Sequence, residues 1–410
     1  MNVNPSILII GKSFLGLEKY LNKHNYTYKI LLDERLLTDK NSGDPRIIAC
    51  NFKDKKSVEK TLKTIPKPDA LLCIYENYIV QASWVSKYYN LPGLSEEAAK
   101  SCTDKELMRK KFATAKEQIS PGHQVVNSLN DLKNFATKYK FPLILKPANL
   151  TKSMLVHKCH NLDELLDAYN STINIIDDVY AKYAPGNIPK LIVEEFMEGS
   201  IHSVDAFVDA KGKAHVLDQI VDYQTGYDIG YDDNFHYSRI MPSKLSEADQ
   251  KALRKVAKIG CETLGMTSSP AHIEIIITTE GPRIVEIGAR NGGYRERMHY
   301  MANDISTTDN ALRLALNQPL DIKAKKHDPI AVLELFPKIS GDFAGLANEE
   351  VLRKLPSLNY LSIKAKLGQY VGTSSKGHKM VAIIILHNAS QEQFQADLEY
   401  VNKSVFVKIQ

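Results

Sequence analysis

Two glutamates, Glu274 and Glu286, have the spacing of residues that face each other across a β-hairpin. Residues 271–277 and 283–287 are rich in β-branched side chains, and a Glu-Gly-Pro turn signal lies between them in 278–282. A hairpin that turns in this stretch pairs the two glutamates. Because side chains alternate between the two faces of a strand, every second residue of each strand lies on the same face as the glutamates. This set comprises His272, Glu274, Ile276, Ile284, Glu286 and Gly288.

The like negative charges of Glu274 and Glu286 indicate what the pair would bind. Like charges directly opposite one another destabilise a sheet, so the pairing is expected where a cation lies between the carboxylates. Two hard oxygen ligands suit Mg²⁺ that bridges nucleotide phosphates, and Glu274 and Glu286 would then be the metal ligands. The alternative is a hairpin register shifted by one residue, which turns one glutamate to water.

The composition sets limits on the class of protein. The 410 residues suffice for two or three domains with a substantial core, and 53 basic against 48 acidic residues imply neither a nucleic-acid nor a membrane partner. Five cysteines are scattered without a CxxC pair, which indicates a reducing compartment and argues against a disulfide scaffold or zinc site. The run from His157 to Cys159 and His160 lacks zinc-ligand spacing and is expected at a strand edge.

The first residues carry no pattern of a targeting segment. The sequence passes from MNVNP directly into an apolar strand, without a basic region or a small-residue cleavage site. No apolar run reaches the length of a bilayer. A cytoplasmic protein is therefore expected.

Short apolar runs separated by helix-length segments give residues 1–94 the βαβ rhythm of a Rossmann-like unit. The loop 11–16 follows the first strand, but the dinucleotide fingerprint would need glycine at Ser13 and the P-loop would need glycine at Ser6. An ordinary strand-to-helix turn is the preferred interpretation, and dehydrogenase chemistry is discounted. The four runs expected as strands are 6–10, 27–32, 46–50 and 70–74.

Two lysines then stand at positions suited to an anion. Residues 95–117 are expected to be helical, and Thr103-x-x-Glu106 is a capping box that would start a new helix near Asp104. Lys105 then lies in the first turn, either as a solvated lysine or together with exposed amides at an anion. Lys146 ends the apolar strand FPLILKP and is interpreted as a phosphate ligand.

The next strands carry acidic residues. The segment KLIVEEFM, residues 190–197, is expected to be a strand whose backbone beyond Glu195 could pair with an adenine edge. Residues 200–208 alternate and continue the sheet antiparallel, with His202 on one face and Asp205 on the other. Residues 223–239 break the periodicity and are expected to be a long loop that caps a site.

The remaining chain is expected to alternate helices and strands again. A helix is predicted over 246–264, before the glutamate hairpin. Further strands at 331–336 and 380–386 and a helix near 391–401 are expected to form a smaller terminal subdomain from about residue 326.

Taken together, these motifs resemble the ATP-grasp superfamily. The resemblance rests on the Asp104-Lys105 helix start, FPLILKP, VEEFMEG before the strand with Asp205, and E-x₁₁-E-x₃-R, and it covers nearly the whole chain. Within the superfamily, EIGARNGG and LELFPKISG resemble the L-amino-acid ligases that make dipeptides. The resemblance implies an α/β fold with α+β lobes. Its four parts would be a Rossmann-like domain at 1–94, two nucleotide-clasping lobes at 95–189 and 190–325, and a C-terminal subdomain at 326–410.

By this resemblance, the protein would bind ATP together with two Mg²⁺ ions. Mn²⁺ is the alternative metal. The metal would lie at Glu274 and Glu286. The residues implied at ATP are Lys105 and Lys146 on the phosphates, Glu194, Glu195, Phe196 and Met197 on adenine and ribose, and Asp205. In such enzymes a glycine-rich loop follows the strand lysine, whereas residues 148–154 contain no glycine, so that amides from Asn149 to Ser153 would have to reach the phosphates.

The residues after Glu286 are implied in catalysis and substrate choice. Arg290 would face the transferred phosphate and stabilise the oxyanion, because a guanidinium presents a fixed fork of donors. The alternative for Arg290 is a surface arginine beside an ordinary glycine turn. Relatives often carry a metal-binding Asn where Gly288 stands, and Asn291 would substitute for it. The substrate would lie near Gly293, Tyr294, Arg295 and His236, with His236 either structural or directed to phosphate or a substrate carboxylate.

The implied activity is an ATP-dependent carboxylate–amine ligase that forms a dipeptide-like amide through an acyl-phosphate and releases ADP and phosphate. Two alternatives stay open. One is an ATP-grasp ligase for a non-amino-acid carboxylate, which would keep every motif and change only the pocket loops. The other is a protein that binds ATP without catalysis. The absence of glycine from the loop favours this alternative, whereas the opposed glutamates argue against it. Small-molecule substrates and a homodimer are the expected partners.

Overall fold

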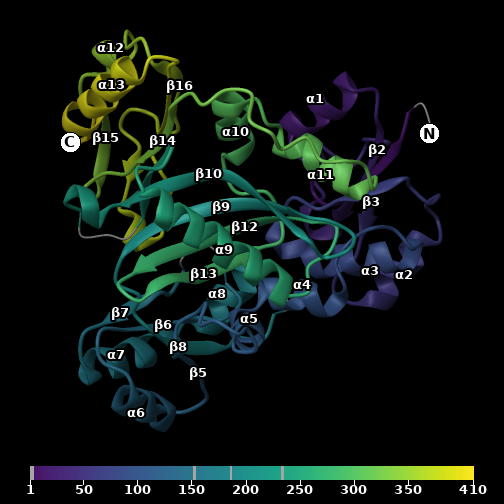
Figure 1. The fold of residues 1–410 in the computed structure, drawn as a ribbon, viewed down its shortest axis with the longest axis horizontal. Coiled ribbons are helices and arrows are strands. Elements are labelled where there is room, and N and C mark those ends of the chain that lie inside the picture. The colour runs from purple at the N-terminus through teal and green to yellow at the C-terminus, as the bar shows by residue number, and fades with distance from the viewer. Residues whose placement is uncertain (1–3, 151–153, 185–186, 232–234) are drawn as a thin grey trace.

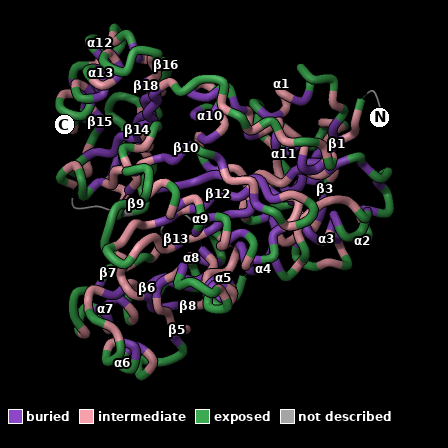
Figure 2. The backbone as a smooth tube through the Cα atoms, viewed as in Figure 1, coloured by how far each residue is buried: buried purple, intermediate pink, exposed green. Residues whose placement is uncertain are grey.

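The computed structural model describes residues 4–150, 154–184, 187–231 and 235–410. Within them the strands form four sheets, and helices cover the sheets on their outer faces (Figure 1). Many of the buried residues belong to the strands of these sheets, as the colouring of the backbone in Figure 2 shows. The chain therefore has the mixed α/β architecture that was expected.

The N-terminal unit is a parallel four-stranded sheet in the order β3-β2-β1-β4. All four predicted strands are confirmed, and the loop after β1 is an ordinary turn into a helix. Gly11 has a φ of +92°, and a Cβ there would lie 2.1 Å from the Tyr78 ring, so the turn requires glycine. The elements are β1 Ser6–Gly11, α1 Leu15–Lys23, β2 Thr27–Asp33, η1 Glu34–Leu36, β3 Ile47–Cys50, α2 Lys55–Leu62, β4 Ala70–Leu72, η2 Glu76–Tyr78 and α3 Ile79–Tyr89.

Two helices lead to a second, antiparallel sheet in the order β5-β8-β6-β7. The run that begins at His157 forms its edge strand, as expected. β8 pairs with β5 and β6, so this sheet extends across the boundary predicted between 189 and 190, and the domain boundaries stay predictions. The elements are α4 Glu96–Thr103, α5 Lys105–Phe112, β5 His123–Val126, α6 Leu129–Lys138, β6 Leu143–Pro147, β7 His157–Cys159, α7 Leu162–Ile173, α8 Ile176–Tyr183 and β8 Leu191–Glu195.

The largest sheet has eight strands in the order β13-β12-β9-β10-β11-β14-β18-β16. The prediction of a long loop over 223–239 is wrong at both ends, because β10 and β11 pair there and Tyr223 is opposite Arg239. The strand pair was not predicted because this stretch is polar and aromatic in composition. Its side chains face a polar site. The elements are β9 Ser200–Val208, β10 Ala214–Thr225, η3 Tyr227–Ile229, β11 His236–Met241, β12 Ser269–Thr278, β13 Gly281–Gly288, β14 Ile330–Leu335, β16 Leu358–Ile363 and β18 Ala382–His387.

Helices cover the two faces of this sheet. The predicted helix before the hairpin is α9, Glu247–Thr263, and its N-cap is Ser246. Its apolar side packs on β9, β12 and β13, where Ile273 and Ile287 are fully buried. On the other face, α10, Arg295–Asn303, packs Met298 and Ala302 against β10, β11 and β14. α11, Thr307–Ala315, connects this layer to the N-terminal sheet.

The last part of the chain adds strands to the eight-stranded sheet and forms the fourth, small sheet. β14 and β18, expected in a terminal subdomain, pair with each other, and β14 pairs with β11. The small sheet has the order β17-β15-β19. Its elements and neighbours are β15 Gly341–Leu346, α12 Glu349–Leu352, β17 Tyr370–Val371, η4 Ser374–Lys376, α13 Gln391–Ser404 and β19 Val407–Ile409.

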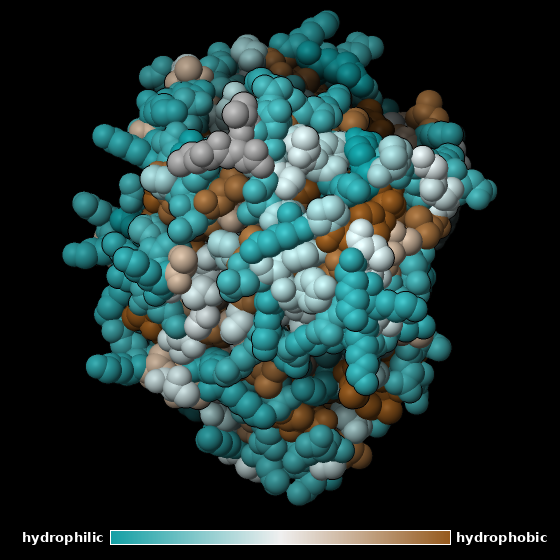
Figure 3. Space-filling model, turned by 90° about the vertical axis from the view of Figure 1, so that its right-hand side faces the viewer, coloured by the Kyte–Doolittle hydropathy of each residue, from teal (hydrophilic) through white to brown (hydrophobic). Residues whose placement is uncertain are grey.

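The surface of the N-terminal side is mostly hydrophilic, with hydrophobic residues in small scattered groups (Figure 3). Within the part of the chain that the structure describes, no helix combines the length and apolar character needed to span a membrane.

Candidate active site

The glutamate hairpin has the predicted register. β12 and β13 are antiparallel, and Glu274 is directly opposite Glu286. The prediction that Ile284 shares their face is wrong, because the register shifts after Glu274 and places Ile284 opposite Ile275. Both isoleucines are buried under α9. A β-bulge therefore turns the side chain of Ile284 into the core and leaves the glutamates on the polar face.

Lys105 reaches this hairpin from the start of α5. Its Nζ lies 2.9 Å from Oε2 of Glu286 and donates to the carbonyl of Leu150 at 3.3 Å. The charge of Lys105 lowers the pKa of Glu286. The predicted position of Lys105 in a first helical turn is confirmed, and its side chain is directed at the opposed carboxylates.

The predicted capping of this helix is wrong in detail. Asp104, not Thr103, is the N-cap, and its carboxylate accepts hydrogen bonds from the amides of Glu106 and Leu107. The amide of Lys105 donates to the carbonyl of Ala148. The first amides of α5 are therefore occupied and do not form the anion site that was considered, because an aspartate already meets the positive end of the helix.

Lys146 points into a buried cluster of charges. Its Nζ lies 2.5 Å from Oε2 of Glu194, and Nε of Arg109 lies 2.9 Å from the other oxygen of that carboxylate. Burial lowers the pKa of Lys146 to about 8. Burial alone would raise the pKa of Glu194, but the charges of Arg109 and Lys146 outweigh it and lower the pKa to about 2.

This cluster links the second sheet to the glutamate hairpin, because Arg109 also donates to the carbonyl of Val285 at 2.7 Å. Glu194 was expected at adenine or ribose, and in this structure both of its oxygens bind cations of the protein. Its role toward a nucleotide stays a prediction.

The hinge after β8 holds the other residues expected at adenine. The carboxylate of Glu195 accepts a hydrogen bond from the amide of Gly122 at 2.5 Å, and the ammonium of Lys158 lies 3.9 Å from the centre of the Phe196 ring. Met197 follows in the connection to β9 and is half-buried. Ser153, expected at the phosphates, lies outside the described residues.

Arg290 is held by the N-terminal unit. Its Nη2 lies 2.7 Å from Oε2 of Glu76, and its Nη1 donates to the carbonyl of Asn291. Burial raises the pKa of Glu76. The side-chain amide of Asn291 donates to the carbonyl of Thr307, so this residue is directed toward α11. The surface interpretation of Arg290 does not hold, because a largely buried carboxylate binds it.

Asp205 lies inside the protein. It is 4% exposed, and its carboxylate binds His272 at 2.8 Å and His299 at 3.0 Å, with Nε of Arg295 at 3.4 Å. Burial opposes ionisation of Asp205, but these three partners lower its pKa. Nε2 of His272 is in turn 3.7 Å from Oε1 of Glu274. Asp205 is therefore linked to Glu274 through His272, and its contact with ATP stays a prediction.

A polar cluster continues along the same sheet face beyond Glu274. Arg239 pairs with Glu334 at 3.1 Å, and the hydroxyl of Tyr294 donates to Glu334 at 2.7 Å. The rings of Tyr223 and His236 are 4.6 Å apart. Two of the expected substrate residues, His236 and Tyr294, thus lie in one cluster that also contains Arg239 and Glu334.

The two glycines before Tyr294 differ in their surroundings. A Cβ on Gly292 would lie 2.4 Å from Nδ1 of His272, whereas a Cβ on Gly293 meets nothing within 4 Å. We expect Gly292→Ala to lower the free energy of unfolding by about 1–3 kcal/mol through overpacking. Gly293→Ala is expected to stay within about 0.5 kcal/mol of the parent protein. Urea unfolding of both variants measures this, and equal losses would contradict the close approach at Gly292.

The donor set fits a magnesium ion that is shared with a nucleotide. Among the described residues, no group of three or more His, Cys, Asp or Glu side chains could hold a metal ion by itself. Mg²⁺ is commonly bound by one or two carboxylates together with substrate phosphates, and Glu274 and Glu286 supply that number. Their opposed charges are compensated from one side by Lys105.

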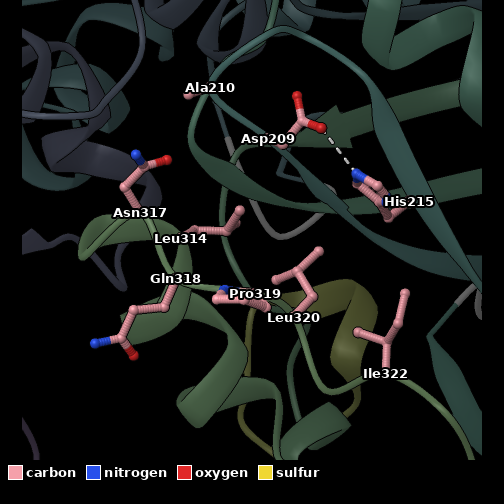
Figure 4. Close-up of a pocket in the computed structure, with 9 residues that line it drawn as sticks. All are labelled: Asp209, Ala210, His215, Leu314, Asn317, Gln318, Pro319, Leu320 and Ile322. Carbon is pink, nitrogen blue, oxygen red and sulfur yellow. Dashed lines mark hydrogen bonds and ion pairs between the residues drawn. The ribbon is translucent and has the colours of Figure 1, made fainter.

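A separate surface pocket of about 340 Å³ contains none of the predicted site residues (Figure 4). It lies between the β9–β10 turn, where Asp209 bonds to His215 at 2.9 Å, and the segment that follows α11. The chemistry-bearing residues are therefore gathered elsewhere, on the sheet face at Glu274 and Glu286.

Comparison with known proteins finds a family model that matches the segment containing this sheet face. Residues 139–308 match the family model described as an ATP-grasp domain. This segment of the chain is thus similar to an ATP-grasp domain. The match confirms the predicted resemblance for the segment in which most of the predicted residues lie, which includes Lys146, Glu194, Asp205, Glu274 and Glu286.

Relatives of known sequence are distant and partial. Phosphoribosylamine–glycine ligase of Methanobrevibacter smithii is 25% identical over 49% of this chain and 47% of its own. Dapdiamide A synthase of Enterobacter agglomerans is 23% identical over 46% of this chain and 42% of its own. An uncharacterized protein of Sinorhizobium fredii is 21% identical over 61% of this chain and 49% of its own. The chain thus spans about half the length of the curated relatives that it matches.

The fold is shared over the whole chain. An L-amino acid ligase from Bacillus licheniformis superposes with a TM-score of 0.78 and 18% identity, covering 100% of both chains. An N5-carboxyaminoimidazole ribonucleotide synthetase from Thermotoga maritima gives 0.68 and 18%, with 99% of this chain and 100% of the other covered. The ATP-grasp fold predicted from the motifs is therefore confirmed.

Several residues that the fold brings to this face could not be assigned from the sequence alone. Arg109, Glu76, Arg239 and Glu334 were not assigned a role, and His272 was placed only by its strand face. Arg109 lies four residues after Lys105 on α5, so helical spacing could have indicated that both point the same way. Glu76 and Glu334 come from distant segments, and local spacing carries no signal for them.

Proposed function

We propose that this protein is an ADP-forming carboxylate–amine ligase, which joins two amino-acid-like substrates through an acyl-phosphate. The observation that carries the proposal is the confirmed pairing of Glu274 with Glu286 inside a segment that matches an ATP-grasp domain, with Lys105 directed at the pair. Opposed carboxylates are costly in a sheet and are explained by a cation and phosphates between them. The fold shared with an L-amino acid ligase over its full length supports the same proposal.

The charged side chains would bind and orient the phosphates of ATP. Mg²⁺, held by Glu274 and Glu286, would neutralise charge on the phosphates. Lys105 would turn from Glu286 to a phosphate, and Lys146 would do so from Glu194. Because Arg109 remains on Glu194, that carboxylate would not be left without a partner when Lys146 moves.

Arg290 would act on the acyl group. A carboxylate is a poor electrophile, and transfer of the γ-phosphoryl group from ATP gives an acyl-phosphate with a better leaving group. When the amine nitrogen attacks the acyl carbon, the guanidinium of Arg290 would stabilise the oxyanion. The C–O bond to phosphate then breaks and phosphate leaves.

The cluster of Tyr223, His236, Arg239, Tyr294 and Glu334 would border the carboxylate substrate. It lies on the sheet face of Glu274, and the large Tyr294 side chain would limit the size of that substrate. Burial lowers the pKa of His236, which favours its neutral imidazole.

Turnover measurements test this proposal. The purified protein is incubated with Mg-ATP and all pairs of the common L-amino acids, and ADP, phosphate and product masses are recorded. We expect ADP release that requires two amino acids and yields a dipeptide. ADP release that depends on neither substrate would contradict the ligase activity, and release that needs a different carboxylate would contradict the amino-acid substrate.

A further inference from the structure

A second group of polar side chains lies on the other face of the eight-stranded sheet from the glutamate hairpin. Asp205 of β9 is directed to the hairpin side through His272, whereas Val204 packs in the core under α9. Because side chains alternate along a strand, Ser200 and His202 lie on the side of Val204. They are therefore separate from the proposed ATP site, which lies on the face of Asp205.

Ser200, His202 and Asp222 form one continuous chain of hydrogen bonds. Oγ of Ser200 lies 2.7 Å from Nε2 of His202, and Nδ1 of the same ring lies 2.8 Å from Oδ1 of Asp222. The two strands that carry these residues, β9 and β10, are neighbours in the sheet (Figure 1), and their register places Asp222 directly opposite His202. Ser200 is two residues before His202 on the same strand, so the sheet itself brings the three side chains together.

Asp222 determines which nitrogen of His202 carries the proton. Its carboxylate also accepts hydrogen bonds from the hydroxyl of Ser243 and from the amide of Lys244. Burial opposes ionisation of Asp222, but the hydrogen bonds from His202 and Ser243 outweigh it and lower its pKa. An ionised carboxylate can only accept, so Nδ1 of His202 donates to it. Nε2 of the neutral ring then accepts the hydroxyl proton of Ser200.

The three side chains differ in exposure in the order that a nucleophile requires. His202 is 4% exposed, Asp222 is partly buried, and Ser200 is exposed. The imidazole is thus shielded from water and held by a carboxylate, whereas the hydroxyl that it contacts is open to an electrophile. A serine hydroxyl on a neutral imidazole that a carboxylate orients is the arrangement that activates serine on several unrelated folds.

We propose that Ser200 is an activated nucleophile and that this face of the sheet hydrolyses activated carboxylic esters without ATP. As Oγ of Ser200 forms a bond to the acyl carbon, its proton moves to Nε2 of His202. That proton passes to the leaving oxygen when the ester C–O bond breaks. Water then attacks the acyl-serine and gives a proton to His202. The acid leaves as its bond to Oγ breaks, and Oγ regains the proton, while Asp222 keeps the ring oriented and stabilises its positive charge.

A fluorophosphonate probe tests the nucleophile, because an activated serine displaces the fluoride and retains the phosphonyl group. The full-length protein is treated without ATP, and peptide mass spectrometry locates the adduct. We expect an adduct at Ser200 that forms on the order of 10²-fold faster than at any other exposed serine, as general-base assistance predicts. Hydrolysis of 4-nitrophenyl acetate by Ser200→Ala is expected to fall to the background rate.

Asp222→Asn separates activation of the serine from mere exposure. The asparagine keeps the size of the side chain, and its oxygen can still accept from the amide of Lys244. Its NH₂ group would donate to Nδ1 of His202, so that Nε2 carries the proton and cannot accept one from Ser200. The rate of labelling is expected to fall on the order of 10²-fold. Circular dichroism of the variant establishes that the fold is retained.

Ser42→Ala is the matched control, since it removes another exposed serine, in the N-terminal unit. It is expected to change neither labelling nor ester hydrolysis. Absence of an adduct at Ser200 in the parent protein would overturn the proposal. Labelling of Ser200 at the same rate in Asp222→Asn as in the parent would also overturn it, because the serine would then react by exposure alone.

Discussion

Glu286→Gln is expected to lose about 10²–10³-fold in turnover with Mg-ATP, the effect of removing one preorganised charge at a transition state. The amide keeps the size of the side chain but binds Mg²⁺ more weakly than a carboxylate. It also leaves Lys105 without the oxygen anion that now lies 2.9 Å away. Steady-state ADP release at several Mg²⁺ concentrations measures the loss, and excess metal is expected to restore part of it.

The same substitution is expected to lower the free energy of unfolding, because Lys105 loses the carboxylate that lies 2.9 Å away and whose pKa its charge lowers. Relief of the repulsion between Glu274 and Glu286 offsets part of this loss. Glu280→Gln is the control in the same hairpin, because the Glu280 side chain is 78% exposed in the turn. A Glu286→Gln variant that retains turnover, or a Glu280→Gln variant that loses it equally, would refute the assignment of the metal site.

Arg109→Met is expected to lower the free energy of unfolding by about 3 kcal/mol, the lower end for breaking a buried ion pair. Arg109 is fully buried, and its loss leaves Glu194 with Lys146 alone and removes the hydrogen bond to the carbonyl of Val285. Methionine preserves most of the side-chain volume, so the loss reports on charge and hydrogen bonds more than on packing. Chemical denaturation measures it.

Arg353→Met is the matched control at the C-cap of α12, where Arg353 pairs with Glu349 on the surface. Exposed pairs of this kind contribute about 0.5 kcal/mol or less. An equally small change in the free energy of unfolding of Arg109→Met would mean that the buried charge cluster contributes little to stability. The contact between Lys146 and Glu194 would then not be explained by stability.

The features predicted correctly from the sequence are those that depend on local patterns. Alternating side chains and a turn signal define the register of Glu274 against Glu286, and the apolar runs define the parallel N-terminal sheet. The helix start at Lys105 follows from its capping residues, although Asp104 rather than Thr103 is the cap. Local patterns also carried the resemblance that the ATP-grasp domain match confirms.

The features missed depend on contacts between distant segments. Glu76 meets Arg290 across 214 positions of sequence, and Asp205 gathers His272, His299 and Arg295 from two later elements. No spacing rule connects such residues. The strand pair at Tyr223 and Arg239 was taken for a loop because its side chains are polar and aromatic, as suits strands that face a site rather than a core.

Transfer of a carboxylate oxygen to phosphate distinguishes an acyl-phosphate intermediate from other routes to the amide. Amino-acid substrates labelled with ¹⁸O in their carboxylates are incubated with Mg-ATP and the protein, and the released phosphate is analysed by mass spectrometry. An acyl-phosphate carries one substrate oxygen, which leaves with phosphate when the amine attacks the acyl carbon, so labelled phosphate is the predicted result. Phosphate that forms with the amide but without label would contradict the acyl-phosphate and the function built on it.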